Sequence, residues 1–229
     1  MRANLPALSS VQTVSLRHVD RTGGERTLEA KIFWKRAEGL SRVRIQVHAP
    51  PDDRGSAYLL RENATGDPEM FVYLPELDKS RRIHPSGASG ALFGTDFSYE
   101  DVGRIQDLGP DVRAELLPEA SLGDIRVAVV AVTVPPEGGS SYSRIVYSVD
   151  AERCVPLLIE FHDAGGALLK RLTADPAKVT REGRGWLVRS VSLEDLKNET
   201  RTDLVVEDIE VEAKLSESLF SQADLARRR

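Results

Sequence analysis

The segment from Met70 to Asp101 reads MFVYLPELDKSRRIHPSGASGALFGTDFSYED and carries the most structural information in the chain. It opens with an apolar run typical of a β-strand, continues with an arginine pair, and closes with an aromatic stretch rich in carboxylates. Its charged residues of interest are Arg81, Arg82, Asp96, Glu100 and Asp101. Because arginines and carboxylates are costly to bury unpaired, the segment predicts a shared polar network beside an apolar surface.

Three roles are open for these charged residues. The first is structural: the carboxylates pair with Arg81 and Arg82 and order the loop and short helix that follow the strand. In that case Arg82→Ala would cost about 3–5 kcal/mol, as breaking a buried ion pair does. The second is recognition of an anionic headgroup, because a guanidinium offers a bidentate fork to phosphate or carboxylate. The third is acid–base catalysis through Asp96 and Glu100 together with the arginines.

Alternation of apolar and polar residues, the pattern of β-strands, dominates the rest of the sequence. Val43, Ile45 and Val47 alternate with polar residues, and the residues from Leu28 to Trp34 repeat this pattern. Phe33 breaks it by joining the polar face, which predicts that its side chain covers an edge or meets a partner. About ten or eleven strands at short spacing predict a mainly β fold, a strongly curved antiparallel sheet or barrel.

Helical signals are few. A short helix is expected at 96–105, where Ser98 precedes Asp101 in a loose capping pattern, and another at 216–226. Residues 186–193 are expected to form one strand. Because no low-complexity linker divides the chain, we expect one domain over residues 1–229, with a core at 11–225.

The composition is that of an ordinary globular protein. The 229 residues are 41% hydrophobic and 29% charged, and the net charge of −5 argues against a nucleic-acid binder that uses a broad basic surface. Cys154 is the one cysteine, so no intramolecular disulfide forms. The four histidines lack metal-ligand spacing, and no phosphate loop or nucleophile elbow occurs, so we expect no metal, no cofactor and no enzymatic activity.

Membrane and export signals are also weak. No apolar run approaches the roughly 18 residues that a membrane-spanning helix needs. Residues 1–10 lack a charged region followed by an extended apolar core, so they do not read as a signal peptide. Two explanations are open: a cytosolic protein, or one whose export signal has been removed.

The aromatic residues of the central segment have two readings. They are either ordinary core packing or the rim of an apolar cavity that contacts an acyl chain, for which a curved sheet with few helices leaves room. The candidate cavity and rim residues are Ile32, Trp34, Ile45, Val47, Tyr73, Phe93, Phe97 and Tyr99.

The central segment, with YLP at 73–75, RRI at 81–83 and FGTDFSYED at 93–101, resembles a hallmark of the outer-membrane lipoprotein-sorting protein family, which has the LolA/LolB-like fold. Weaker similarities extend the resemblance over residues 11–225. It implies an unclosed, half-open antiparallel β-barrel with short helices over its mouth and an apolar interior. It also favours the explanation of a removed export signal, and hence a periplasmic protein.

Three classes of function follow. The resemblance implies a non-catalytic carrier that binds a lipid or a lipidated protein, with an inner-membrane transporter or envelope complex as a possible partner. The alternative is an envelope sensor or protein-interaction module that uses the same concave face. The third is an enzyme acting through the charged residues of the central segment.

Overall fold

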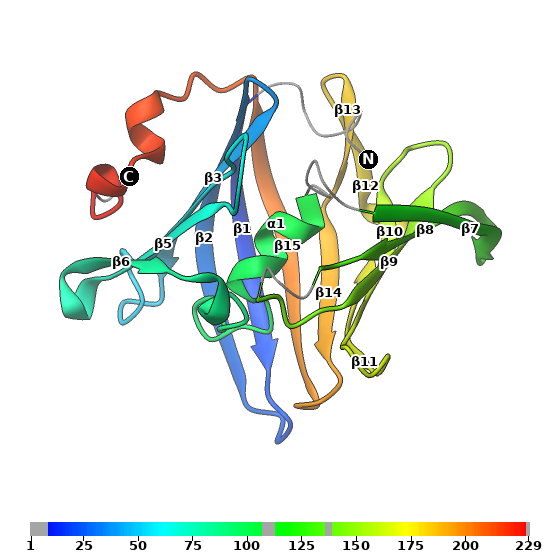
Figure 1. Ribbon diagram of the computed structural model, residues 1–229. Helices are drawn as coiled ribbons and strands as arrows, with labels where there is room; N and C mark the ends of the chain where they lie inside the picture. The colour runs from blue at the N-terminus through cyan, green and yellow to red at the C-terminus, as the bar shows by residue number, and fades with distance from the viewer. Residues whose placement is uncertain (1–8, 107–112, 136–138, 228–229) are drawn as a thin grey trace.

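One large antiparallel sheet forms the framework of the protein (Figure 1). The computed structural model describes residues 9–106, 113–135 and 139–227. Thirteen strands follow the order β6-β5-β4-β3-β2-β1-β15-β14-β11-β10-β9-β8-β7. Most neighbours in this order are also neighbours in sequence. The exceptions are β1 beside β15, which pairs the first strand with the last, and β11 beside β14, which leaves out the separate β12–β13 hairpin.

The strands of the first half are β1 (Ser10–Val19), β2 (Glu25–Ala37), β3 (Leu40–Ala49), β4 (Ala57–Arg61), β5 (Glu69–Leu74), β6 (Lys79–Ile83) and β7 (Arg113–Leu122). Those of the second half are β8 (Ile125–Thr133), β9 (Arg144–Asp150), β10 (Pro156–His162), β11 (Leu168–Ala174), β12 (Val179–Glu182), β13 (Gly185–Val188), β14 (Ser190–Asp195) and β15 (Thr200–Val211). The edge strands β6 and β7 do not pair with each other, so the sheet stays open. The expected mainly β, half-open fold is confirmed, although the strand count is larger than ten or eleven.

The additional strands lack the signals that sequence analysis uses. β6 and β7 lie at the sheet edges, and most of their residues are exposed or half-buried, so neither shows an apolar face. β12 is a four-residue strand in the separate hairpin. The single strand expected at 186–193 is instead two, β13 and β14, which belong to different sheets.

The described residues contain one α-helix, α1 (Tyr99–Gln106), close to the expected 96–105. Its start has the predicted cap: the Ser98 N–H donates to Asp101 Oδ2 at 2.7 Å, and the Asp101 N–H donates to Ser98 Oγ at 3.3 Å. The helix expected at 216–226 is wrong, because two short 3-10 turns, Glu217–Phe220 and Gln222–Asp224, occupy that segment. Further 3-10 turns lie at Pro75–Leu77, Pro85–Gly87 and Pro176–Lys178. None of the described helices has the length and apolar character needed to cross a membrane.

The sheet has two differently covered faces. The inner face bends around α1, with β4–β6 to one side and β7–β10 to the other (Figure 1). Its main core includes Val14, Trp34, Ile45, Phe97 and Leu193. On the outer face, the C-terminal segment packs its apolar side chains over β2, β4 and β5. That second cluster consists of Phe33, Ala57, Leu59, Phe71, Tyr73, Leu219, Phe220 and Leu225.

Phe33 faces the outer side of the sheet, but the expectation that it covers a sheet edge is wrong, because β2 lies between β1 and β3. The residues that cover it come from the far end of the chain. Burying this second apolar layer explains how a sheet strand can tolerate large apolar side chains on both faces.

Candidate functional site

An apolar cavity of about 230 Å³ lies on the inner face, between the sheet and the segment that contains α1. Strands β1, β2, β3, β14 and β15 form its floor, because alternate residues of each strand point to the same side. The loop before α1, α1 itself and β13 form its cover. The lining residues are Ser10, Gln12, Val14, Leu16, Leu28, Ala30, Ile32, Trp34, Val43, Ile45, Val47, Leu92, Phe93, Thr95, Phe97, Val102, Ile105, Pro156, Leu172, Trp186, Leu187, Val188, Val191, Leu204 and Val206.

The chemistry of this lining is almost uniform. Within the described ranges, Ser10, Gln12 and Thr95 are its polar members, and no charged side chain belongs to it. The Thr95 hydroxyl donates to the Leu92 carbonyl at 2.7 Å, so its hydrogen-bonding capacity is used within its own loop. Such a surface favours an apolar ligand and offers few polar contacts to orient it.

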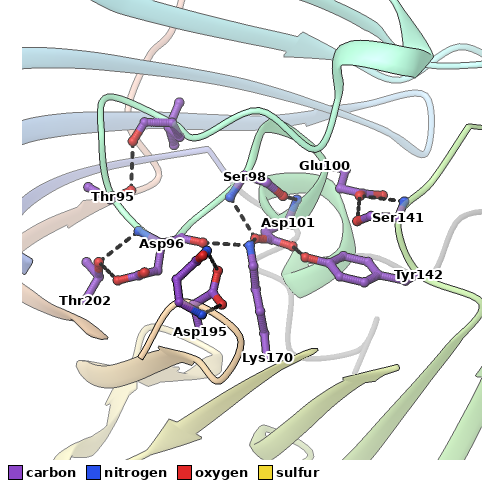
Figure 2. Close-up of polar contacts among 12 residues, drawn as sticks. Thr95, Asp96, Ser98, Glu100, Asp101, Ser141, Tyr142, Lys170, Asp195 and Thr202 are labelled. Carbon is purple, nitrogen blue, oxygen red and sulfur yellow. Dashed lines mark hydrogen bonds and ion pairs between the residues drawn. The ribbon is translucent and has the colours of Figure 1, made fainter. Parts of the chain in front are cut away.

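The carboxylate of Asp96 fastens the start of the cover to the sheet (Figure 2). Thr202 donates to Asp96 Oδ2 at 2.6 Å and accepts from the Asp96 N–H at 3.0 Å. Thr200 also donates to this carboxylate, and His18 Nδ1 lies 3.0 Å from Asp96 Oδ2. Three side chains from β1 and β15 therefore bind one buried carboxylate.

Asp101 forms the second attachment and is fully buried. Its carboxylate accepts from Lys170 Nζ at 2.9 Å and from the Tyr142 hydroxyl at 2.7 Å (Figure 2). Lys170 also donates to the Asp96 carbonyl at 2.7 Å, so one ammonium group bridges both ends of the loop. Burial and the nearby Asp101 carboxylate raise the pKa of Tyr142, which keeps the phenol protonated as a donor.

Glu100 forms the third attachment. Its carboxylate accepts from the Ser140 hydroxyl at 2.6 Å, from the Ser141 hydroxyl at 2.6 Å and from the Ser141 N–H at 3.1 Å. Asp96, Glu100 and Asp101 thus all bind groups on other parts of the chain. Together they fix the cover of the cavity in place, which is a structural role.

A family model described as that of an uncharacterized protein matches residues 39–227. The chain belongs to the DUF1329 family. No functionally curated protein matches the sequence. Solved structures show that this DUF1329 protein has the fold of the LolA superfamily. A DUF1329 protein from Desulfovibrio piger is 22% identical, with a TM-score of 0.88 over 98% of this chain and 93% of that one.

Two further structures support the same fold. A domain from Vibrio parahaemolyticus, described as that of an outer membrane lipoprotein-sorting protein, is 24% identical, with a TM-score of 0.86 over 96% of this chain and 92% of that one. A LolA superfamily protein from Nitrosomonas europaea is 20% identical, with a TM-score of 0.76 over 96% of this chain and 93% of that one.

Six of the eight candidate cavity residues line the cavity of this DUF1329 protein: Ile32, Trp34, Ile45, Val47, Phe93 and Phe97. Their contact with a ligand stays a prediction. Tyr73 was placed wrongly, because it lies in the outer-face cluster. Tyr99 is not a lining residue; its ring stacks on Tyr58 at a centroid distance of 5.4 Å.

Sequence analysis missed the lining residues of β14 and β15, such as Val191 and Leu204, and those of β13. For the residues of β15, the available signal was the alternation of apolar and polar residues within 202–211. It does not show that β15 pairs with β1, and that pairing is what places its apolar face beside the cavity.

The predicted pairing of Arg81 and Arg82 with the carboxylates is wrong. Arg82 has a side chain 57% exposed, and its recorded ion-pair partner is Glu69, at 4.0 Å. Arg81 is paired with Val72 in the β5–β6 ladder and borders a surface pocket together with Gln222 of the C-terminal segment. Both arginines belong to the edge strand β6, whereas Asp96 binds Thr200 and Thr202 of β15. Lys170, rather than either arginine, is the cation that pairs with Asp101.

Arg82→Ala is therefore expected to change the free energy of unfolding by no more than about 0.5 kcal/mol, because exposed ion pairs contribute little. Urea denaturation of the variant and the unmodified protein measures this directly. A loss of several kcal/mol would instead indicate that Arg82 belongs to a buried ion pair, as the sequence suggested.

Proposed function

We propose that this DUF1329 protein is a non-catalytic carrier that binds the acyl chain of a lipid or lipidated protein in its inner-face cavity. The observation that carries this proposal is the cavity lining, in which the described residues include three polar ones and no charged ones beside a continuous apolar surface. Each methylene moved from water into such a surface contributes about 0.8 kcal/mol. A long acyl chain thereby gains useful affinity without a covalent bond.

The placement of the acidic residues supports a carrier over an enzyme. Asp96, Glu100 and Asp101 each accept several hydrogen bonds from the protein itself and hold the cavity cover. Carboxylates engaged in this way are poorly placed to exchange protons with a substrate.

We further propose that the carrier works in the periplasm and exchanges its cargo with an inner-membrane transporter or envelope complex. The LolA superfamily fold supports this placement, as does the likeness to a domain described as belonging to an outer membrane lipoprotein-sorting protein. An envelope sensor that uses the same cavity is the alternative. Tight partner binding by a protein with an empty cavity would favour it.

Native mass spectrometry, followed by organic extraction and lipid analysis, tests the carrier directly on protein exported to the periplasm. A stoichiometric acylated molecule that leaves on extraction is the expected result. A ligand-free mass combined with no uptake of an added fluorescent acyl ester would overturn the proposal.

Ala30→Phe provides the matched variant, because Ala30 is buried on the cavity floor and a phenyl ring there fills the space that an acyl chain needs. We expect uptake of the fluorescent acyl ester to fall at least tenfold. Ala120→Phe makes the same substitution at an exposed position of β7 and should leave uptake unchanged. Equal uptake by both variants would place the ligand outside this cavity.

A further inference from the structure

The cavity has one polar corner, formed by Ser10, Gln12 and Trp34. Ser10 and Trp34 are direct partners in the β1–β2 ladder, and Gln12 lies two residues further along the same face of β1. Gln12 Nε2 is 3.5 Å from Ser10 Oγ, to which it donates. All three side chains line the cavity, and Trp34 is only 1% exposed.

The indole N–H of Trp34 is buried and has no hydrogen-bond partner within the described part of the chain. Indole nitrogen can only donate, and a buried donor left unpaired is both rare and costly. Other buried donors beneath the cover are satisfied: the Tyr58 hydroxyl donates to the Tyr99 carbonyl and the Tyr147 hydroxyl to the Arg104 carbonyl, each at 2.9 Å. Ser41 Oγ and His48 Nε2 on β3 are also buried without a partner in the described ranges, but neither residue lines the cavity. Among the described residues that line the cavity, the unpaired donor is the Trp34 N–H, which indicates a place for an acceptor.

The charge of that acceptor follows from the lining. Among the residues that the structure describes, no cationic side chain belongs to the cavity wall, so a carboxylate or phosphate beside Trp34 would be buried without a counter-charge from them. A neutral carbonyl oxygen carries no such penalty and matches a single N–H donor. We propose that Trp34 binds the carbonyl oxygen of an acyl ester, which makes the cargo an esterified acyl chain rather than a free fatty acid.

This inference rests on the proposed carrier function and adds an orientation for the cargo. β1 begins at the upper end of the sheet in Figure 1, the end at which the β12–β13 hairpin also lies. The ester is bound at this end, beside Trp34, and the hydrocarbon tail extends below α1 towards Phe93 and Phe97. The rest of the esterified molecule then leaves the cavity past the hairpin.

Three probes with the same chain length test the assignment: methyl hexadecanoate, hexadecane and hexadecanoate. Competition with a fluorescent acyl probe measures their affinities. We expect the ester to bind the unmodified protein about tenfold more tightly than hexadecane, the gain of about one neutral hydrogen bond, and more tightly than the carboxylate. In Trp34→Phe the ratio of ester to hexadecane affinity should fall to near one.

Trp186→Phe is the matched control, because the other tryptophan of the chain also lines the cavity. It should keep the tenfold preference for the ester. A preference that survives Trp34→Phe, or that is absent from the unmodified protein while all three probes bind, overturns the ester site and leaves the carrier intact. Failure of every probe to bind overturns both.

Nuclear magnetic resonance gives a second measurement that needs no folded Trp34 variant. The indole N–H resonance of Trp34 should move downfield when methyl hexadecanoate is added and much less with hexadecane. Equal movements would contradict the hydrogen bond. A comparison of a dihexadecanoyl glycerol with a dihexadecanoylated cysteine peptide then separates a lipid source of the ester from a lipidated-protein source.

Discussion

Replacement of Arg44 by methionine is expected to lower the free energy of unfolding by about 3–5 kcal/mol. Arg44 is fully buried on the outer face and holds the C-terminal segment through five contacts. Its Nη1 lies 3.1 Å from the carbonyls of Leu219 and Asp224 and from Asp224 Oδ2, and its Nη2 donates to the carbonyls of Leu225 and Arg227. Methionine fills much of the space but leaves the Asp224 carboxylate without this partner.

Arg42→Met is the matched control. Arg42 lies two residues earlier on the same face of β3 and pairs with Glu217, but its side chain is partly exposed. We expect a loss below about 1 kcal/mol. Urea denaturation measures both variants, and limited proteolysis shows whether Arg44→Met releases residues 213–227. Similar losses for the two variants would mean that the outer-face apolar cluster alone holds the segment.

Alternation along the central strands made much of the cavity floor predictable. Ile32, Trp34, Ile45 and Val47 follow from period two within single strands, and this period also singles out Phe33 as facing the other way. What covers Phe33 could not be predicted, because Leu219 and Phe220 lie almost a whole chain length away. Patterns within one strand identify faces, whereas strand pairing decides which faces meet.

The polar network shows the same limit. Proximity in sequence favoured the arginines of β6 as partners of Asp101, whereas Lys170 lies 69 residues away. The stretch around Lys170 reads as a strand with one wet face, so a lysine there gives no signal of burial. Its position follows from the pairing of β11 with β10 and β14, which no local pattern encodes.

Lys170→Met is expected to destabilise the protein by about 3–5 kcal/mol, because it leaves the Asp101 carboxylate buried without its cation. The Ser98 N–H and the Tyr142 hydroxyl remain as donors, but neither carries a charge. The variant also removes the donor to the Asp96 carbonyl, so the cover should loosen before the sheet does. Hydrogen exchange of residues 98–105 should accelerate more than that of β1 and β2.

Arg171→Met separates this effect from the loss of a positive charge on β11. Arg171 is the next residue, faces the other side of the sheet and pairs with Glu160 at 3.5 Å from a partly exposed position. Its replacement should cost less than about 1 kcal/mol. If urea denaturation shows that Lys170→Met lowers the free energy of unfolding no more than Arg171→Met does, the neutral donors alone hold Asp101. If it loses several kcal/mol and exchange accelerates throughout the sheet, the cover and the sheet unfold as one cooperative unit, and cargo must enter without detachment of α1.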